Sequence, residues 1–533
     1  MTQLAASPRE IELPELPEHY NAATTYVDAH RDTRADRVAI RCQGNTVTYG
    51  ELGANVDRAG HALLSLGLDI EDRVVILCLD SPAFVYAFFG AIKIGAIPVP
   101  TNTLLTARDL RYILEDSRAV AVVVSAPLLP KVLEIRAELP RLRHVIVAGP
   151  GAAPEGTATD GVVSFEDALH AADPELAPAD TTPDDACFWL YSSGTTGFPK
   201  GAAHLQHDML FCAETYGASV LGSTEQDRHF TVSPLFHAYG LGNGVFFPFH
   251  VGASSVLKPE RPTPELVYEL ITKERPTVLF TAPTFYAALL AYPEPDFPYD
   301  LSSLRFAVSA GEALPKPLFE AWKRRFGIEI LDGIGSTEML HIFISNFPGK
   351  ARGGTSGTVV PGYAAKIVDD DGRDLPPGAS GHLWVSGDSA CAYYWNKHEK
   401  TKATIRGEWM VTGDTYHLDA DGCFTYEGRS DDMLKVSGQW VSPAEVEAAL
   451  MGHAAVLEAA VVGVKDKDEL TKPKAYVTVK AGRSADDALA DELKAFVKGR
   501  ITPYKYPRWI VFMPELPKNA AGKIQRFKLR ELG

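Results

Sequence analysis

The chain has 533 residues and a formal net charge of −16, and 46% of its residues are hydrophobic. Because this length exceeds that of one ordinary domain, we expect several domains. The hydrophobic fraction excludes a disordered protein, and the acidic balance argues against a general binder of nucleic acid or anionic membranes.

The six cysteines are scattered and form no CxxC pair. This spacing favours buried free thiols in a reducing cytoplasm over a disulfide framework or a zinc site. The first twenty residues carry acids and prolines without an apolar core, so no signal peptide is expected. The longest apolar stretch, between Asp80 and Lys93, is too short to span a bilayer. We therefore predict a soluble, cytoplasmic protein without a membrane partner.

From about Arg73 onward, short β-branched runs alternate with helical patterns, for example at 73–80, 119–126 and 143–149. The same rhythm returns after residue 253, up to about residue 311. Continuous apolar strands separated by amphipathic helices are typical of parallel sheets covered on both faces. The two stretches lie on either side of a Gly-rich segment, so we expect two α/β subdomains.

Residues 355–430 carry many Gly and Asp turn signals between short strands, which favours a β-rich subdomain. A helix, two strands, another helix and a last strand follow, enough for a separate α+β domain. We therefore predict an α/β fold with two domains. The N-terminal domain, at 1–430, contains two α/β sheets layered with helices plus the β-rich subdomain, and the C-terminal α+β domain occupies 431–533.

The Gly-rich segment SSGTTGFPKG, at 192–201, follows an apolar run at the end of a predicted strand. Backbone N–H groups exposed by glycines, neighbouring hydroxyls and a lysine suit the binding of phosphates. The segment departs from the Walker pattern, since Lys200 is preceded by Pro199 and followed by Gly201. Taken alone, such a segment is more often an ordinary turn.

Five further motifs follow the Gly-rich segment in order. They are SAGEALP (309–315), DGIGSTE (332–338), TGD (412–414), GRSDDMLKVSGQWVSP (428–443) and PKNAAGKIQR (517–526). With these motifs the chain resembles the adenylate-forming acyl-CoA ligases over almost its whole length. The resemblance implies a large N-terminal domain and a mobile C-terminal domain. It also implies that ATP and a carboxylate give an acyl-adenylate and pyrophosphate, after which the thiol of coenzyme A (CoA) displaces AMP.

The resemblance assigns the ATP-binding residues. Those expected at the β- and γ-phosphates are Ser193, Gly194, Thr195, Thr196, Gly197 and Lys200. Those expected at the adenine are Gly311, Glu312, Asp332, Gly333 and Ile334. Thr337 is expected at the α-phosphate, Asp414 at the ribose, and Arg429 at the ribose or phosphate. Glu338 is the expected Mg²⁺ ligand, because a hard carboxylate suits a hard cation.

The expected catalytic residues are Thr195, Glu338 and Lys523. By resemblance, Lys523 lies on a C-terminal loop and reaches the carboxylate and α-phosphate as charge develops there. A single lysine is normally a solvent-facing residue, but the flanking motif favours catalysis here. Asp431 matches the hinge about which the small domain turns. CoA is expected in a tunnel lined by Ser437, Gly438 and Trp440.

The stretch SPLFHAYGLGNG, at 233–244, corresponds to the entrance of the family's acyl pocket. It lacks the acidic residue by which amino-acid-activating modules hold an amine, which argues against α-amino acids. Together with 332–343 it predicts a neutral, aromatic-walled pocket for a mostly apolar acid. The pocket residues are expected to be Phe236, His237, Ala238, Tyr239, Gly333, Gly335, His341 and Ile342.

Details of both stretches, and the ending KIQRFKLREL, are similar to the benzoate-CoA ligase group. The similarity implies benzoate or a small substituted benzoate as the acid. Hydroxybenzoate and aminobenzoate stay open, because Tyr239 and His341 can hydrogen-bond a ring substituent. His341 can equally be a packing residue.

The leading hypothesis is thus an ATP-dependent aryl-CoA ligase that uses ATP, Mg²⁺ and CoA. The alternative is a free-standing adenylation enzyme that loads an aryl acid onto a carrier protein. A luciferase-like oxygenase also stays open, whereas an inactive nucleotide-binding protein is disfavoured by the intact motifs. Neither the ring substituents nor the oligomeric state follows from the sequence, and a homodimer is one option.

Overall fold

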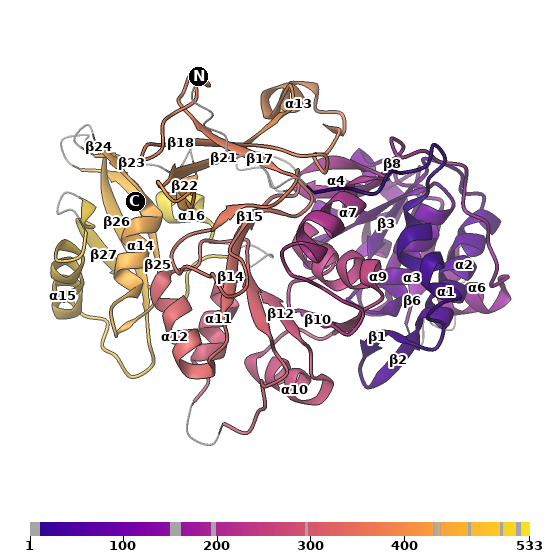
Figure 1. Ribbon diagram of the computed structural model, residues 1–533, viewed down its shortest axis with the longest axis horizontal. Helices are drawn as coiled ribbons and strands as arrows, with labels where there is room; N and C mark the ends of the chain where they lie inside the picture. The colour runs from indigo at the N-terminus through magenta and orange to yellow at the C-terminus, as the bar shows by residue number, and fades with distance from the viewer. Residues whose placement is uncertain are drawn as a thin grey trace.

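The computed structural model describes residues 11–149, 161–192, 199–293, 297–429, 432, 434–436, 439–466, 471–501, 505–518 and 524–532. These residues form two large sheets covered by helices, smaller antiparallel sheets, and an α+β part near the C-terminal end (Figure 1). The predicted α/β fold class, with two α/β sheets, a β-rich part and a separate α+β part, is confirmed.

The nine-stranded sheet has the order β16-β15-β14-β13-β12-β10-β11-β1-β2. Its central strands pair in parallel, as predicted. The edge strands β2, β15 and β16 pair antiparallel, because the short connections before β2 and β15 leave no room for a crossover helix. In sheet order the strands span Thr358–Val359, Ile342–Ser345, Ile330–Gly335, Phe306–Ser309, Val278–Thr281, Arg228–Thr231, Ser254–Leu257, Val38–Cys42 and Asn45–Thr48.

The second large sheet has the order β4-β3-β5-β6-β7, and all its pairs are parallel. In sheet order the strands span Ile97–Pro100, Arg73–Leu77, Ala121–Ser125, His144–Ala148 and Val162–Ser164. Helices connect the first four of these strands along the chain, as the alternating pattern predicts. The connecting helices are α3 (Pro82–Lys93), α4 (Ala107–Asp116) and α5 (Leu129–Ile135), and α6 (Phe165–Ala171) follows β7.

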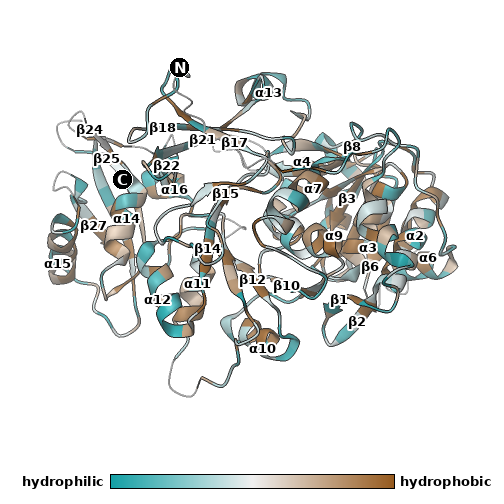
Figure 2. Cartoon of the chain, in the orientation of Figure 1, coloured by the Kyte–Doolittle hydropathy of each residue, from teal (hydrophilic) through white to brown (hydrophobic). Residues whose placement is uncertain are grey.

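Helices α2 (Tyr49–Ser65) and α3 pack together in the N-terminal part. A capping box starts α2: Thr48 Oγ1 accepts from the Glu51 N–H at 3.2 Å, and Glu51 Oε2 accepts from the Thr48 N–H at 2.8 Å. Helix α3 is apolar over most of its surface and is mostly brown in Figure 2. Such a helix is stable only when it is buried.

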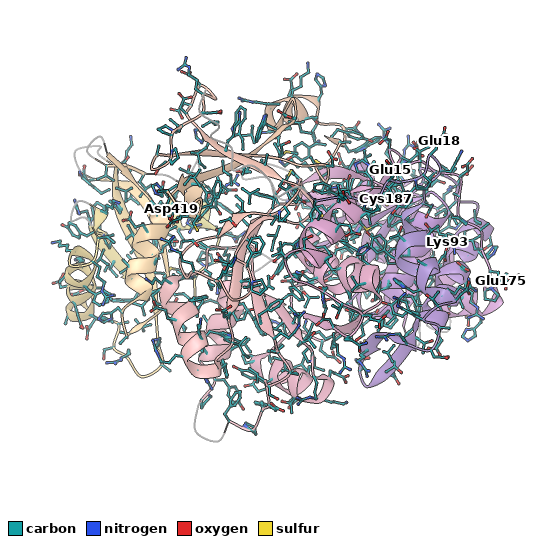
Figure 3. The ribbon with its side chains drawn as sticks, viewed as in Figure 1. Glu15, Glu18, Lys93, Glu175, Cys187 and Asp419 are labelled. Atoms are coloured by element: carbon teal, nitrogen blue, oxygen red, sulfur yellow. The ribbon has the colours of Figure 1, made fainter. Side chains whose placement is uncertain are left out.

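A buried group of charges joins these two helices. The Lys93 ammonium, 1% exposed, donates to Asp28 Oδ1 at 2.7 Å and to Asp57 Oδ1 at 2.5 Å (Figure 3 labels Lys93). Arg31 donates to the other oxygen of Asp57 at 2.5 Å. Because two cations face two carboxylates, removing one partner should cost about 3–5 kcal/mol. The group fixes α2 against α3.

The remaining helices before the β-rich part flank the nine-stranded sheet and the region around it. They include α7 (Asp208–Cys212), α8 (Ala238–Leu241), α9 (Phe247–Val251), α10 (Pro264–Glu274), α11 (Pro283–Leu290) and α12 (Lys316–Phe326). No helix in the described ranges is long and apolar enough to cross a membrane.

Two antiparallel sheets complete the N-terminal part. The three-stranded sheet contains β19 (Tyr393–Tyr394), β9 (Lys200–Leu205) and β8 (Ala186–Ser192). The other contains β17 (Ala364–Val368), β18 (Ser380–Ser386), β21 (Trp409–Leu418), β20 (Ile405–Arg406) and β22 (Phe424–Arg429). The second sheet is the β-rich part predicted from the turn signals.

The described residues of the C-terminal part form a hairpin, a three-stranded sheet and three α-helices. The strands are β23 (Leu434–Val436), β24 (Gln439–Val441), β25 (Val456–Lys465), β26 (Thr471–Val479) and β27 (Trp509–Phe512). The helices are α14 (Pro443–Met451), α15 (Asp487–Lys498) and α16 (Arg526–Glu531). Helix α14 contacts β22 and α12, which places this part beside the nine-stranded sheet (Figure 1).

All six cysteines are free, and five of them, including Cys187 in Figure 3, are buried. Burial raises the pKa of the Cys78 thiol to about 12. Thiols in such surroundings are poor nucleophiles. The five buried cysteines are therefore core residues here.

Candidate functional site

The Gly-rich segment leaves β8 at Ser192 and enters β9 at Lys200, and these two residues pair at the end of the hairpin. The Tyr112 hydroxyl of α4 donates to the Pro199 carbonyl at 3.0 Å. Strand pairing and α4 thus fix both ends of the segment. The predicted phosphate-binding residues between them lie outside the described residues: Ser193, Gly194, Thr195, Thr196 and Gly197.

Glu338 lies beside the end of this hairpin. Its Oε1 accepts hydrogen bonds from Ser192 Oγ at 3.1 Å and from the Tyr394 hydroxyl at 2.7 Å. Lys200 Nζ lies 3.4 Å from the same oxygen and donates to the Tyr394 hydroxyl at 2.7 Å. Its ammonium also lies 3.9 Å from the centroid of the Tyr394 ring. Four residues from three distant segments form one polar cluster.

This polar cluster keeps the Glu338 carboxylate ionised. Burial alone would raise the pKa of Glu338, but the Lys200 ammonium and the hydrogen bonds from Tyr394 and Ser192 outweigh burial and lower it. Burial, reinforced by the Glu338 charge, raises the pKa of Tyr394. The tyrosine therefore stays protonated and donates to the carboxylate.

The polar cluster fits the expected role of Glu338 as a Mg²⁺ ligand. The three side chains that contact the carboxylate all approach Oε1. Mg²⁺ is usually bound by one or two carboxylates together with substrate phosphates and water. In the described ranges, no group of three or more His, Cys, Asp and Glu side chains could hold a metal ion by itself. A cation at Glu338 would share its coordination with phosphate oxygens.

The residues expected at the adenine lie at the carboxyl ends of neighbouring parallel strands. Gly311 and Glu312 follow β13, and Asp332, Gly333 and Ile334 lie in the adjacent strand β14. Gly311 has a φ of +90°, and no described atom lies within 4 Å of the position that a Cβ would take. Glu312 Oε2 accepts from the Thr284 hydroxyl at 2.7 Å. Ligands commonly bind at this edge of parallel sheets.

Asp332 is 5% exposed, and burial raises the pKa of its carboxyl well above the ordinary value. Its backbone carbonyl accepts from the Asn346 N–H at 2.9 Å and from Asn346 Nδ2 at 3.0 Å. The asparagine therefore fixes the backbone of β14 where the predicted adenine contacts begin.

Asp414, predicted at the ribose, and Arg429, predicted at the ribose or phosphate, are opposite each other in β21 and β22. Arg429 Nη1 donates to Asp414 Oδ1 and to the Thr412 carbonyl, both at 3.1 Å. Gly413, between Thr412 and Asp414 in the sequence, has a φ of +75°, and a Cβ there would lie 2.7 Å from Arg429 Nη2. The structure thus brings the TGD and GRS motifs into one place.

The predicted acyl-pocket residues come from two segments. Ala238 and Tyr239 begin α8, directly after Phe236 and His237, whose rings lie 4.5 Å apart. The other segment is the β14–β15 hairpin, in which Gly335 pairs with Ile342. The two segments meet where the ring of Tyr239 stacks on that of His341, with centroids 5.7 Å apart. The expected residues of both stretches are thus neighbours.

His341 is 2% exposed, and neither of its ring nitrogens has a hydrogen-bond partner among the described residues. Burial lowers the pKa of this imidazole to about 3, so it is neutral at pH 7. The Tyr239 hydroxyl donates to the Val308 carbonyl at 3.0 Å. A neutral ring with unpaired nitrogens can both donate to and accept from a small polar group.

Four further predicted residues lie outside the described residues: Asp431, Ser437, Gly438 and Lys523. Trp440 lies in β24. The base of the segment that contains Lys523 is described: Lys518 forms a backbone bridge with Ile524, and the Gln525 N–H donates to the Pro517 carbonyl at 2.8 Å. The chain on both sides of Lys523 is therefore held together.

Two members of the polar cluster were missed from the sequence. Ser192 precedes the predicted phosphate-binding residues, and Tyr394 belongs to none of the six motifs. The only signal for Tyr394 was the aromatic run at 393–395, which also suits a core strand. Its place beside Glu338 depends on the pairing of β19 with β9.

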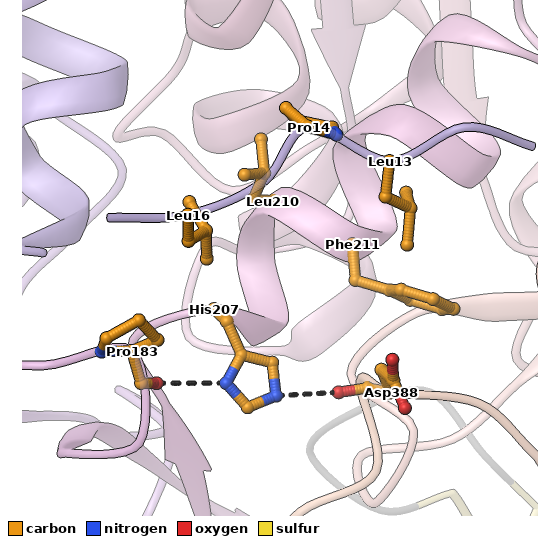
Figure 4. A pocket seen from close by; sticks show the side chains of 8 residues that line it. All are labelled: Leu13, Pro14, Leu16, Pro183, His207, Leu210, Phe211 and Asp388. Atoms are coloured by element: carbon orange, nitrogen blue, oxygen red, sulfur yellow. Dashed lines mark hydrogen bonds between the residues drawn. The ribbon is translucent and has the colours of Figure 1, made fainter. Parts of the chain in front are cut away.

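A groove of about 310 Å³ lies elsewhere, beneath the N-terminal segment (Figure 4). The two ring nitrogens of His207 face backbone carbonyl oxygens there, which can only accept: that of Pro183 at 2.9 Å and that of Asp388 at 3.1 Å. None of the predicted site residues lines this groove. Its lining residues are Leu13, Pro14, Leu16, Pro183, His207, Leu210, Phe211 and Asp388.

The chain is similar to known proteins over nearly its whole length. It is 48% identical to "Benzoate--CoA ligase" of Thauera aromatica, covering 97% of each chain. The structure matches that of the anthranilate CoA ligase AuaEII in complex with anthranoyl-AMP, with a TM-score of 0.93 and 44% identity over 97% of this chain and 98% of that chain. It also matches a benzoate CoA ligase from Burkholderia xenovorans LB400, with a TM-score of 0.89 and 44% identity over 96% of this chain and 100% of the other.

Two family models match the sequence. The model for AMP-binding enzymes covers residues 27–395, and the model for the AMP-binding enzyme C-terminal domain covers residues 445–523. The first match contains the β8–β9 hairpin with its predicted phosphate-binding segment (called the phosphate hairpin below), Glu338 and the predicted acyl-pocket residues. The second match reaches Lys523. The chain belongs to the family of AMP-binding enzymes.

Proposed function

We propose that this protein joins an aromatic carboxylic acid to CoA in an ATP-dependent reaction with an aryl-adenylate intermediate. The observation that carries the proposal is the nearly full-length similarity to ligases that are named for benzoate and anthranilate. The cytoplasm is the expected location of such an enzyme. We further infer a division at about residue 430 between an ATP- and acid-binding domain and a small domain that supplies Lys523.

The reaction has two steps. In the first, a carboxylate oxygen attacks the α-phosphorus of ATP, and pyrophosphate leaves. In the second, the CoA sulfur attacks the acyl carbon, and AMP leaves. A carboxylate is a poor electrophile, and joining it to AMP supplies a good leaving group. Because the carboxylate and the triphosphate are both negatively charged, the enzyme has to neutralise charge and hold the reacting atoms in line.

The polar cluster at Glu338 supplies part of this electrostatic environment. The Gly-rich segment, with Thr195, would hold the β- and γ-phosphates, and Lys200 at its end is aligned by Tyr394 and Glu338. A Mg²⁺ ion bound by Glu338 and the phosphates would neutralise their negative charge. Thr337 would then contact the α-phosphate from the adjacent position.

The nucleoside would lie along the carboxyl ends of β13 and β14. The Gly311–Glu312 turn and 332–334 would frame the adenine, since Gly311 leaves space for a flat ring. The Asp414 carboxylate would accept hydrogen bonds from the ribose hydroxyls. Arg429, already paired with Asp414, would neutralise charge there.

The acid would lie between α8 and the β14–β15 hairpin. The aromatic rings of Phe236 and Tyr239 and the side chain of Ile342 make an apolar surface, and His341 is neutral. A second charge on the acid would be poorly solvated in these surroundings. We infer benzoate or a benzoate with a small hydroxyl or amino substituent as the substrate.

CoA is proposed to enter from the C-terminal part, past Ser437, Gly438 and Trp440, after this part turns about Asp431. Loading of a carrier protein is not favoured, because the similar proteins named above are CoA ligases. An adenylate that is formed but not consumed by CoA would reverse this preference.

The first experiment measures AMP release with ATP, Mg²⁺ and CoA for a panel of acids. The panel contains benzoate, the three hydroxybenzoates, 2-aminobenzoate, cyclohexanecarboxylate, hexanoate and phenylalanine. We expect CoA-dependent turnover to be fastest with benzoate or a substituted benzoate. Fastest turnover of hexanoate or phenylalanine would contradict the proposed pocket.

A further inference from the structure

A buried histidine–aspartate pair lies between the phosphate hairpin and the turn that contains Glu338. His204 belongs to β9, and Asp208 begins α7; both side chains are 0% exposed. His204 Nδ1 lies 2.7 Å from Asp208 Oδ2, and its Nε2 lies 2.8 Å from the Thr337 carbonyl. Since a carboxylate and a carbonyl both accept, the ring donates from both nitrogens.

The orientation of this imidazole is fixed by its surroundings. Its ring stacks on Phe188 of β8 with centroids 5.2 Å apart and an angle of 20°. The Leu205 N–H donates to Asp208 Oδ2 at 3.2 Å, and His207 Nε2 lies 3.2 Å from the other oxygen of Asp208. Hydrogen bonds to an ionised partner are short and strong. The aspartate thus aims the histidine at Thr337.

The turn at 337–339 is held through its three carbonyl groups. Their donors from distant segments, in chain order, are His204 Nε2, the Cys391 N–H at 2.7 Å and Ser389 Oγ at 2.8 Å. Within the turn, the Leu340 N–H also donates to the Thr337 carbonyl at 3.2 Å, and the His341 N–H donates to the Met339 carbonyl at 2.7 Å. The next residue, Leu340, has a φ of +63°, a conformation that costs a non-glycine residue about 1 kcal/mol or more. Bonds from distant segments therefore hold a turn that its own sequence would not favour.

We propose that His204, oriented by Asp208, is a positioning residue for the ATP-dependent step. Its Nε2–H holds the Thr337 carbonyl, and this bond sets the Thr337 side chain and the Glu338 carboxylate relative to the phosphate hairpin. The inference rests on the proposed function, in which Thr337 faces the α-phosphate and Glu338 binds Mg²⁺. His204 itself touches no substrate.

Two substitutions separate the two hydrogen bonds of the ring. In His204→Gln, the longer amide reaches the position of Nε2 and keeps a donor for the Thr337 carbonyl. In His204→Asn, the shorter amide reaches the position of Nδ1 and keeps the bond to Asp208 but loses the one to Thr337. Both variants lose the aromatic ring and its stacking on Phe188.

The measurement is calorimetric binding of ATP with Mg²⁺, in the absence of acid and CoA so that no turnover occurs. We expect the dissociation constant to rise about tenfold in His204→Asn, as for the loss of one buried hydrogen bond. In His204→Gln it should change less than about threefold. No binding to the wild-type protein would instead count against the proposed function.

His229→Gln is the matched control, because His229 is also 0% exposed and has partners at both nitrogens, Ser223 and the Asn243 carbonyl. It should lower the melting temperature without weakening ATP binding. Equal binding losses in the two His204 variants, or none in His204→Asn, would overturn the proposal. So would a wild-type complex with ATP and Mg²⁺ in which the Thr337 carbonyl has turned away from His204, a test that does not depend on a variant that folds.

Discussion

At the scale of single residues, Tyr394 joins the predicted phosphate lysine to the predicted metal ligand. Its hydroxyl donates to Glu338 and accepts from Lys200, so one group orients a cation and an anion. Lys200 and Glu338 also form an ion pair with each other at 3.4 Å. The tyrosine hydroxyl bonds to both charged groups and so fixes their positions relative to each other.

We predict that Tyr394→Phe slows adenylation about tenfold or more, as for the loss of a hydrogen bond to a charged group. The ring would stay beneath the Lys200 ammonium, so the cation–π contact persists. Pyrophosphate release with saturating acid would measure the rate. Tyr268→Phe is the control, since it removes the buried hydrogen bond of 2.8 Å that the Tyr268 hydroxyl donates to the Leu289 carbonyl, away from the site. Equal adenylation rates in the two variants would contradict the role of Tyr394.

We predict that Lys523→Ala abolishes adenylation but spares thioester formation from preformed aryl-adenylate. The lysine is proposed to balance charge only while the carboxylate attacks the α-phosphorus. Pyrophosphate release would report the first half-reaction, and thioester formation from synthetic benzoyl-adenylate would report the second. The exposed Lys528, five residues further on, gives the control Lys528→Ala. Equal loss of both half-reactions would show that Lys523 acts differently.

At the scale of elements, the sequence predicted the regular part of the fold well. Runs such as 73–80 and 119–126 are apolar and β-branched because their strands are buried on both faces, and they form β3 and β5. The edge pairings were not predictable in the same way. β19 has two residues and pairs with a strand about 190 positions earlier. No local pattern encodes such a contact, which is why Tyr394 was missed although Glu338 and Lys200 were found through motifs.

The loop between β10 and α8 gives a prediction about an element. A Cβ at Gly240 would lie 2.0 Å from the Pro234 carbonyl oxygen and 2.5 Å from that of Ser233. Both atoms are backbone, so the loop that contains Phe236 would have to move. We predict that Gly240→Ala costs about 1–3 kcal/mol of unfolding free energy, as for overpacking, and raises the KM for benzoate.

Denaturant unfolding would measure the effect of Gly240→Ala on stability, and the reaction rate at a series of benzoate concentrations would measure its effect on KM. Gly499→Ala, at the end of α15, is the matched control, because no atom lies closer than 3.7 Å to its added Cβ. It should change the unfolding free energy by about 1 kcal/mol or less. A Gly240→Ala variant with normal stability and normal KM would contradict the close contact.

At the scale of the whole molecule, the C-terminal part is joined to the rest by polar contacts near the GRSDD motif. Ser442 Oγ donates to the Glu427 carbonyl of β22, and helix α14 packs on the same strand. Arg526, three residues after Lys523, donates to both oxygens of Glu447 at 2.9 and 2.8 Å. The start of α16 is thus tied to α14, so the segment beside Lys523 moves with the C-terminal part.

Buried titrating groups make the stability of the whole molecule depend on pH. Burial lowers the pKa of His229 to about 4, whereas an unfolded histidine has a pKa of about 6.5. Between these values the unfolded chain binds a proton that the folded protein does not, so this histidine's contribution to stability is complete above about pH 6.5 and is lost toward pH 4. Asp80 has the opposite effect on the pH dependence of stability. Burial raises its pKa to about 6, although the positive charge of Lys258 favours a lower value. The pH dependence of the wild-type unfolding free energy therefore does not isolate the contribution of His229. The difference between a variant and the wild type is a better test.

We predict that replacing His229 by Gln reduces the stability lost between pH 7 and pH 5 by about 2 kcal/mol relative to the wild type. Denaturant unfolding at both pH values gives this difference directly, since the contribution of Asp80 cancels. Ser223→Ala is the control: it removes the hydroxyl that lies 3.1 Å from the ring but leaves the imidazole in place. This control should have a lower unfolding free energy at both pH values. Between pH 7 and pH 5 it should lose as much of that free energy as the wild type does. If His229→Gln and the wild type lose equal stability, then the pKa of His229 in the folded protein is close to that of an unfolded histidine, and burial does not lower it.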